Sequence, residues 1–439
     1  MNIAFEKNVL PNGLRVLVHK DTTTPMAAFN LLYDVGARDE HPEHTGLAHL
    51  LEHLMFSGTR RFPDFDKVIE GVGGENNAFT NNDFTNYYLQ MPKAHLEVAF
   101  EVESDRMRHL VLSQKKVDIQ KNVVIEEFKE RYLNRPYGDV DLLLRPLCYT
   151  RHPYAWATIG KETAHIADMP LTEIKAFYDR YYRPDHAILA VAGPVEAGEV
   201  FALADKWFGG IPAGGQTPRQ LPIEPAQTAA RHLEVVRDVP YSTFYKAYHI
   251  GPRMSQDFYV FDLVSDLFSN GKSSRFYVEL VKKQRLFNEL DAYVSGDIEP
   301  GTFYIKGRLN DGVGYAEAEA ALQAQLDLLV AQCPPAHEME KVKNKLETAL
   351  LFSNLKALDK ATNLCYFELM GGAENLSVEM ERYQAIDGLQ MQEAVARCLR
   401  KENASTLYYT ASEAGRAALA AESPGMEDDF DGDAEEEKA

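Results

Sequence analysis

The sequence predicts an α+β fold of two similar halves, each an antiparallel sheet packed with helices, which together form a clamshell around a cavity. Three observations predict it. The chain has 439 residues, which is too many for one ordinary core. Eight glycines and prolines crowd residues 209–227, a density that no helix or central strand tolerates. Motifs of the first part return about 215 residues later, as expected of an internal repeat.

These observations set the expected domain boundaries. We expect a first half at 1–208, an interdomain linker at 209–230 and a second half at 231–420. Residues 421–439 are rich in acids and predict a disordered, solvated tail.

The elements of the first half follow from hydrophobic periodicity and from glycine and proline positions. Alternating apolar residues predict strands, and longer stretches with helical spacing predict helices. Strands are expected at 12–21 after a turn, 27–35, 75–80 after a turn at 73–74, 85–91 and 187–192, and helices around residues 49–53, 94–110 and 114–133.

The second half repeats the signals of the first. A strand at 242–253 ends in Gly-Pro-Arg, which echoes Gly-Ala-Arg at 36–38. The helix after it ends in Leu-Phe-Ser-Asn-Gly, which echoes Leu-Met-Phe-Ser-Gly at 54–58. Long helical stretches are expected at about 314–332 and 336–370.

Composition and charge exclude several classes of protein. The hydrophobic content of 45% and the charged content of 26% are typical of a soluble globular protein. The net charge is −20, and about −12 remains without the acidic tail, which argues against a nucleic-acid partner. No window approaches the ~18 apolar residues that span a bilayer, so we expect no membrane partner.

Cysteines and the N-terminus indicate the compartment. The four cysteines are far apart and form no C-x-x-C pair, so we expect free thiols in the core. The first residues do not resemble a secretion signal, so we expect a cytoplasmic protein, or a periplasmic one if a leader was trimmed.

The run His49-Leu50-Leu51-Glu52-His53 is the strongest chemical signal. On a helix, His49 and His53 lie one turn apart on the same face, where one metal ion can meet both imidazoles. Glu52 projects from nearly the same side and can act as a base toward water. Catalytic zinc needs three protein ligands and one open position, and this run offers two of the ligands. The alternative is a pair of satisfied core histidines.

A third ligand is expected from another helix, and the best candidate is Glu127. It shares the inward face of Val123 and Val124, whereas Glu126 falls on a more solvated face. From composition alone, an ordinary surface charge on an acidic helix explains either glutamate.

The ordered set of motifs resembles the pitrilysin, or insulinase, family of inverted-zincin metallopeptidases, which includes the mitochondrial processing peptidases. The resemblance covers almost the whole chain except the tail. Its motifs are His49-x-x-Glu52-His53, the Gly-Gly-Glu-Asn-Asn-Ala-Phe-Thr run at 73–80, Tyr87, Asp105-Arg106-Met107, Glu127 and the strand from His186 to Gly193.

The resemblance implies a zinc endopeptidase. It assigns one Zn²⁺ to His49, His53 and Glu127, and it makes Glu52 the base that activates the metal-bound water. It also implies that an unfolded peptide adds as a strand along Asn77, Ala78 and Phe79, although Phe79 alone also fits a buried strand. The negative net charge suggests an acidic cavity that favours basic peptides.

Two departures from the family pattern predict a partner chain. The family's supporting glutamate, seven residues before the third ligand, is Gln120 here. An Arg and a Tyr that bind the substrate carbonyl correspond to Val281 and Asn288. We therefore expect the zinc-bearing subunit of a heterodimer, whose related second chain supplies the Arg/Tyr pair. A homodimer is the alternative.

Two other functions remain open from the sequence. The chain could be a non-catalytic peptide-binding or assembly subunit of a peptidase complex, because Gln120 and the missing pair weaken the catalytic prediction. It could also be a structural metal protein, although structural zinc sites are closed by four ligands. The intact Glu52 argues for catalysis.

Overall fold

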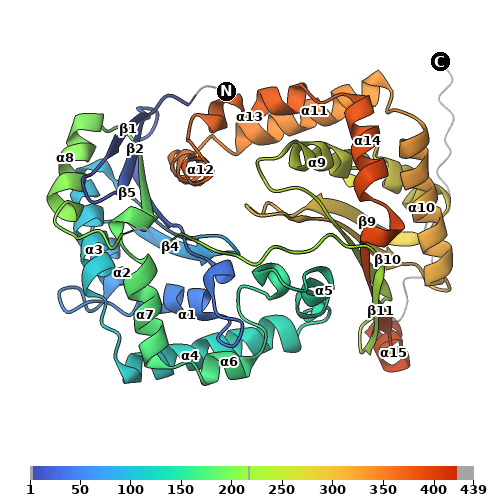
Figure 1. The fold of residues 1–439 in the computed structure, drawn as a ribbon, viewed down its shortest axis with the longest axis horizontal. Coiled ribbons are helices and arrows are strands. Elements are labelled where there is room, and N and C mark those ends of the chain that lie inside the picture. The colour runs from blue at the N-terminus through green and yellow to red at the C-terminus, as the bar shows by residue number, and fades with distance from the viewer. Residues whose placement is uncertain (1–2, 216–217, 423–439) are drawn as a thin grey trace, which may run out of the picture.

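The computed structural model describes residues 3–215 and 218–422, and it contains two halves that each hold one sheet and a set of helices. Figure 1 shows the halves side by side, with the first half in blue and green and the second in yellow and red. The predicted α+β class with two similar halves is confirmed.

The first sheet has six strands in the order β1-β2-β6-β3-β5-β4. All of its neighbours are antiparallel except β2 and β6, which are parallel, so the prediction of an antiparallel sheet was wrong for this pair. Residues 21–186, which contain three strands and most helices of this half, separate these two strands in the chain, and so long a connection permits parallel pairing where a hairpin does not. The strands are β1 (Glu6–Val9), β2 (Arg15–Lys20), β3 (Met26–Tyr33), β4 (Glu75–Thr80), β5 (Thr85–Pro92) and β6 (Ala187–Gly193).

Helices cover one face of this sheet and enclose the larger core of the first half. Alternate residues of β3, such as Phe29 and Leu31, point into that core with the apolar side of α1. The helices are α1 (Leu47–Met55), α2 (Phe65–Glu70), α3 (Leu96–His109), α4 (Gln114–Phe128), α5 (Val140–Cys148), α6 (Thr163–Ala167), α7 (Leu171–Tyr181) and α8 (Ala197–Phe208).

The second sheet has five strands in the order β7-β11-β8-β10-β9 and repeats the topology of the first. Here β7 and β11 are the parallel pair, so the same correction applies. The strands are β7 (Arg231–Arg237), β8 (Thr243–His249), β9 (Phe287–Val294), β10 (Thr302–Leu309) and β11 (Ala404–Ala411).

The helical stretch predicted at 336–370 is two helices, α11 and α12, separated by a turn at 353–356. The Asn354 side chain donates to the Leu350 carbonyl at 3.0 Å and accepts from Asn363 at 3.0 Å, which stabilises the turn. The helices of this half are α9 (Gln256–Ser269), α10 (Tyr315–Ala331), α11 (Ala336–Phe352), α12 (Ala357–Leu369), α13 (Asn375–Gln384), α14 (Gly388–Cys398) and α15 (Glu413–Glu422).

The two halves exchange one helix each. Helix α12 of the second half packs on β3 and β6 of the first sheet, where Ala361, Leu364 and Cys365 are fully buried. Helix α5 of the first half packs on the second sheet in the same way, with Leu144 against its β-strands. Figure 1 shows both helices between the sheets. This exchange joins the two halves through buried contacts.

The remaining expectations concern the linker, the tail and the cysteines. The described residues between Ile211 and Arg231 form no helix or strand, while most of the predicted acidic tail, 423–439, lies outside the described residues. Cys148, Cys365 and Cys398 are buried free thiols, and Cys333 is exposed. Among the described residues, no helix is both long and apolar enough to cross a bilayer.

Candidate metal centre

Helix α1 begins at a site that holds its first turn firmly. Gly46 precedes the helix with φ +88°, and a Cβ there would lie 2.5 Å from the Ile159 carbonyl oxygen, so only glycine fits. The buried Glu40 carboxylate accepts the Gly46 and Ala48 amides at 2.9 and 2.8 Å. The Trp156 indole donates to the same carboxylate at 3.0 Å. A remote side chain therefore satisfies amides that helix starts leave unpaired.

The apolar stripe of α1 orients the polar residues of the motif. Leu50, Leu51 and Leu54 are fully buried in the core of the first half. His49 and His53 lie on another face, and their ring centroids are 4.8 Å apart. Their side chains are 13% and 25% exposed, so a small ion and water can reach them.

Helix α4 brings Glu127 to the two histidines. Its inner stripe contains the buried Val117, Val124 and Phe128, and Glu127 lies beside this stripe with its side chain 17% exposed. Val123, which was expected to face inward, is 45% exposed. Glu126 is solvated, as predicted, and it pairs with Lys129 at 2.7 Å.

The three donor groups converge on one point. The Glu127 carboxylate lies 3.3 Å from Nε2 of His53 and 3.9 Å from Nε2 of His49. One ligand atom from each residue lies within 4.8 Å of the others. Donor atoms that share a zinc ion at ~2.1 Å are about 3–4 Å apart, so this arrangement is close to that of a zinc site.

The protonation states also suit metal binding. Burial and the neighbouring His53 lower the pKa of His49 to about 4, so its imidazole is neutral at pH 7. The His53 hydrogen bond is the main cause that lowers the pKa of Glu127, which stays a carboxylate. Neutral imidazole and carboxylate are the forms that bind metal.

Glu52 stands next to the ligands and has one hydrogen-bond partner among the described residues. The Thr80 hydroxyl, at the end of β4, donates to Oε2 of Glu52 at 2.5 Å. Burial raises the pKa of Glu52, while this hydrogen bond opposes the rise. A carboxylate with a raised pKa and one free oxygen is suited to accept a proton from water.

Other acidic and histidine clusters do not compete with this site. Among the described residues, His49, His53 and Glu127 are the one group of at least three such side chains close enough to hold a metal. At the equivalent place in α9, Asp262 accepts the Tyr383 hydroxyl at 2.6 Å and Asp266 accepts the Asn270 amide at 2.7 Å. The second half keeps the helix but uses these positions for structure.

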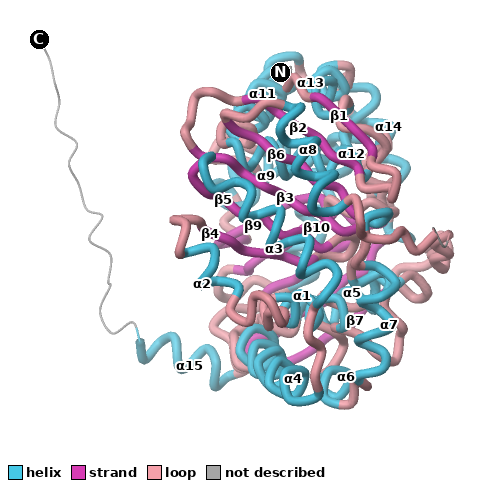
Figure 2. Tube along the Cα trace, turned by 90° about the vertical axis from the view of Figure 1, so that its left-hand side faces the viewer, coloured by secondary structure: helices cyan, strands magenta, loops and turns pink. Residues whose placement is uncertain are grey.

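Strand β4 is one of the two edge strands of the first sheet, since it pairs with β5 alone among the described strands. Figure 2 shows β4 at the margin of the sheet. Asn77, Ala78 and Phe79 all lie on this strand, and Phe79 is 38% exposed, so the buried-strand alternative for Phe79 was wrong. The edge leads directly to Thr80 and therefore to Glu52.

A pocket of about 540 Å³ opens between the halves next to the metal ligands. Arg131 lines it and lies 3.0 Å from the Glu127 carboxylate. The lining contains four cationic side chains and one acidic side chain. The expectation of an acidic cavity, which was drawn from the net charge alone, was therefore wrong for this pocket.

The positions that depart from the family pattern lie elsewhere. Gln120 is half-buried on α4, two turns before Glu127, and makes no hydrogen bond within the described part of the chain. Val281 lies in a π-helical turn after α9, and Asn288 is exposed on β9. None of them contacts the three ligands by a hydrogen bond or ion pair within the described residues.

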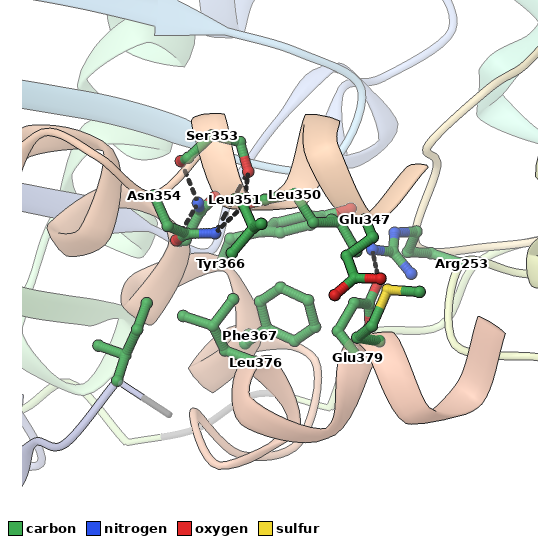
Figure 3. Close-up of a pocket in the computed structure, with 13 residues that line it drawn as sticks. Arg253, Glu347, Leu350, Leu351, Ser353, Asn354, Tyr366, Phe367, Leu376 and Glu379 are labelled. Atoms are coloured by element: carbon green, nitrogen blue, oxygen red, sulfur yellow. Dashed lines mark hydrogen bonds and ion pairs between the residues drawn. The ribbon is translucent and has the colours of Figure 1, made fainter. Parts of the chain in front are cut away.

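Another pocket lies in the second half and shares no residue with the metal centre. It has a volume of about 160 Å³ and is lined mainly by α11, α12 and α13. Figure 3 shows Arg253 and Glu379 paired at one end of it, where their atoms are 2.5 Å apart. The two charges of this pair therefore offset each other within the protein.

Sequence reasoning missed three residues of the site: Thr80, Glu40 and Arg131. Thr80 was recognised as the end of a strand and of the motif at 73–80 but was given no role, since its contact with Glu52 depends on how β4 packs on α1. Glu40 lies six residues before Gly46 and carried no capping signature. Arg131 follows Glu127 by four residues, so helical spacing could have indicated their ion pair.

Comparison with known sequences gives consistent matches over most of the chain. The model of the family described as "Insulinase (Peptidase family M16)" matches residues 15–137, and that of "Peptidase M16 inactive domain" matches residues 168–346. The zinc protease PqqE of Helicobacter pylori is 30% identical over 82% of both chains. The mitochondrial-processing peptidase subunit beta of Saccharomyces cerevisiae is 30% identical over 46% of this chain and 44% of that one.

Comparison with solved structures gives the same fold. A protease from Helicobacter pylori matches with a TM-score of 0.86 and 26% identity, over 93% of this chain and 100% of that one. The periplasmic protease PqqL of Escherichia coli matches with a TM-score of 0.77 and 18% identity, over 95% of this chain but 50% of that one. Pitrilysin matches with a TM-score of 0.77 and 20% identity, over 93% of this chain and 45% of that one.

Proposed function

The chain belongs to the insulinase family of peptidases, family M16, and from this membership we propose that it is a zinc-dependent endopeptidase subunit that hydrolyses unfolded peptides. The observation that carries the proposal is the convergence of His49, His53 and Glu127 next to Glu52. Three ligands leave one coordination position open, which is typical of catalytic rather than structural zinc sites.

The donor set fits zinc. Two imidazoles and one carboxylate are ligands that zinc prefers, and their separations allow one ion to meet all three. A zinc ion held there would act as a Lewis acid that polarises the scissile carbonyl and lowers the pKa of water.

Glu52 would move the proton in the reaction. Its free oxygen accepts a proton from the attacking water, whose oxygen forms the new bond to the carbonyl carbon. When the carbon–nitrogen bond breaks, Glu52 returns the proton to the leaving amine. The Thr80 hydroxyl holds the other carboxylate oxygen and so keeps Glu52 in one orientation.

Strand β4 would bind the substrate. A peptide that pairs with its free edge gains backbone hydrogen bonds that do not depend on sequence. Asn77, Ala78 and Phe79 lie along this edge, and its end at Thr80 directs the peptide toward Glu52. Only an extended, unfolded segment can pair in this way.

The variant Glu52→Gln tests this mechanism. We expect peptide cleavage to fall by about 100- to 10,000-fold, the range that a general base contributes, while one zinc per chain remains bound. Zinc content by mass spectrometry and hydrolysis of a quenched fluorescent peptide give the two readouts. Unchanged cleavage by the variant would exclude Glu52 as the base.

We also propose that the chain works with a second chain of the same fold. PqqL and pitrilysin are about twice as long as the part that this chain matches, and the yeast relative is named as a subunit. Val281 and Asn288, at the positions of the family's Arg/Tyr pair, also favour a separate source for those residues.

Mixing experiments test this second proposal. The purified chain is assayed alone and with a co-expressed related chain, with and without a chelator. We expect chelator-sensitive cleavage only in the mixture, and a mixture made with Glu52→Gln as the control should be inactive. Full activity of the lone chain as a monomer would contradict the proposal, whereas activity of a lone dimer would support the homodimer alternative.

A further inference from the structure

The pocket beside the metal centre is built from both halves and is rich in cations. The segment after α4 contributes one wall, and β8, β9 and β10 contribute the other. Arg131 connects the pocket to the metal ligands through its 3.0 Å ion pair with Glu127. The charged lining residues are Arg131, Arg135, Lys306 and Arg308, with Asp141 as the one acid.

Strand alternation directs the cations of β10 into this pocket. Phe303, Ile305 and Leu309 are buried in the core of the second half, so the residues between them face the opposite side of the sheet. Lys306 and Arg308 lie on that side and their side chains are each 31% exposed. Their position is fixed by the sheet, because β10 pairs with a strand on each side.

Carboxylates near the pocket neutralise only part of this charge. Glu289 serves two cations, with Lys306 at 3.7 Å and Arg308 at 2.9 Å. Asp291 faces Lys306 across the strands, and burial and then the Glu289 carboxylate raise its pKa, while Lys306 and Arg308 lower it. Arg135 is exposed and makes no ion pair within the described residues.

The other two charges at the pocket have partners of their own. Burial alone would lower the pKa of Arg145. Neighbouring groups, the Asp141 carboxylate first among them, raise this pKa above its ordinary value. Asp141 is therefore balanced by this buried cation. Glu127 is balanced by Arg131 and, in the proposed function, would also bind the metal. The cations still outnumber the acids at the pocket, and Arg135 is the one that makes no ion pair within the described residues.

Tyrosines complete the wall and offer further donors. Tyr132, Tyr245 and Tyr293 line the pocket. Burial raises the pKa of each of them, in Tyr293 to about 12, so their hydroxyls stay protonated at neutral pH. Phenolic hydroxyls and guanidinium groups are both good donors to carboxylate oxygens.

We infer that this pocket, which we call the basic subsite, binds an aspartate or glutamate side chain of the peptide close to the scissile bond. The inference rests on the proposed peptidase function and adds a substrate class to it: acidic peptides. Arg135, Lys306 and Arg308 are its specificity-determining residues. The preference is the opposite of that suggested by the net charge of −20.

Matched peptides test the inference in the metal-loaded enzyme with its partner. One quenched peptide is made with Glu, Gln or Lys at each position around the cleaved bond. We expect the Glu peptide to exceed the Gln peptide at least about tenfold in kcat/KM at one position, and the ratio to fall as salt screens the charges. Equal cleavage of all three at every position would overturn the inference while the peptidase function stands.

Variants assign the preference to the basic subsite. Arg135→Gln and Lys306→Gln should reduce the Glu-to-Gln ratio, and Arg135→Glu should favour the Lys peptide. Arg60→Gln is the matched control, because Arg60 is exposed and does not line the pocket. Loss of the ratio in the Arg60→Gln control, or its retention in all three subsite variants, would contradict the assignment.

Binding provides a readout that does not depend on activity. Fluorescence anisotropy of labelled Glu and Lys peptides is measured on metal-loaded Glu52→Gln protein, and the Glu peptide should bind more tightly. A chain ended after Glu422 removes residues 423–439 as a competing source of carboxylates, and the preference should persist in it. Selective binding without any cleavage by the wild type would refute the peptidase function alone, whereas equal binding would refute the subsite.

Discussion

At the residue scale, the hydrogen bond from Thr80 to Glu52 is the contact that most directly supports the proposed chemistry. It joins the last residue of the substrate-binding edge to the proposed base at 2.5 Å. Because burial raises the pKa of Glu52 and this bond opposes it, the hydroxyl also favours the ionised form that accepts a proton. Thr80 is thus a positioning residue.

Replacing the Thr80 hydroxyl by a methyl group should slow the chemical step. Thr80→Val keeps the shape of the side chain, and we expect kcat to fall about ten- to a hundredfold, the worth of one hydrogen bond to a charged group. KM and zinc content should stay unchanged. Steady-state kinetics measure this, and Thr80→Ser should restore most of kcat. A valine variant with wild-type kcat would show that the contact has no role.

A buried histidine makes stability depend on pH. His152 is 4% exposed, its Nδ1 accepts the Tyr154 amide at 3.2 Å, and burial lowers its pKa to about 4. In the unfolded chain the imidazole has its ordinary pKa of about 6.5. Between pH 6.5 and pH 4 the unfolded state therefore binds more protons than the folded state does. The contribution of His152 is therefore complete above pH 6.5 and is lost as the pH falls toward 4.

The expected size of this effect is about 2 kcal/mol between pH 7 and pH 5. Urea unfolding at the two pH values measures it. His152→Asn keeps an acceptor for the Tyr154 amide but does not titrate. On going from pH 7 to pH 5, the free energy of unfolding of this variant should therefore fall by about 2 kcal/mol less than that of the wild type. Equal losses in the two proteins would show that His152 is not the group responsible.

At the element scale, the start of α1 depends on Glu40. Its carboxylate accepts two backbone amides of the first turn and the Trp156 indole. Burial raises the pKa of Glu40 to about 8, against the effect of these donors. Burial thus makes a charge on Glu40 costly, and its contacts with these donors hold the helix that carries His49 and His53.

Glu40→Ala should weaken both folding and metal binding. The variant leaves buried donors without an acceptor, which costs about 1–3 kcal/mol, and it loosens the turn next to His49. Urea unfolding and zinc titration measure the two effects. Glu40→Gln retains one acceptor oxygen and should fall between the alanine variant and the wild type. Wild-type stability and zinc affinity in Glu40→Ala would contradict this role.

Most elements could be predicted from local signals, and the errors have long-range causes. Alternation gave β3 and β5, and the spacing around His49 gave α1, because these patterns are written within a few residues. The break between α11 and α12 depends on contacts of Asn354 and on the sheet that α12 covers. The parallel pairing of β2 with β6 depends on where the chain returns to the sheet after β3, β4 and β5.

The residues of the site also divide into those that local sequence patterns indicate and those that long-range packing brings together. The two histidines and Glu52 are recognisable from spacing within one helical turn, and Glu127 was chosen from family resemblance. The basic subsite combines the segment after α4 with strands more than 100 residues away, so no local pattern indicates it. The net charge misled because much of it lies in the tail and not at the pocket.

At the scale of the whole molecule, the exchanged helices make the two halves one cooperative unit. Helix α12 covers the first sheet and α5 covers the second, and ion pairs such as Lys360–Asp21 at 2.6 Å add to the contact. We therefore expect opening for substrate between chains rather than within this one. This agrees with the proposal of a second chain.

A mutation in the second half should therefore unfold the first half. Leu364→Ala removes a fully buried side chain of α12 and should cost about 2–5 kcal/mol. Both tryptophans, Trp156 and Trp207, lie in the first half and report on it by fluorescence, while circular dichroism reports on the whole chain. The urea midpoints by both probes should fall together. An unchanged fluorescence midpoint would show that the halves unfold independently.

The central claim is that His49, His53 and Glu127 bind one zinc ion next to Glu52. Anomalous diffraction at the zinc absorption edge from crystals of the zinc-loaded chain tests it most directly. We predict one strong peak, between Nε2 of each histidine and the Glu127 carboxylate. No peak at that position, or the main peak on other side chains, would contradict the account.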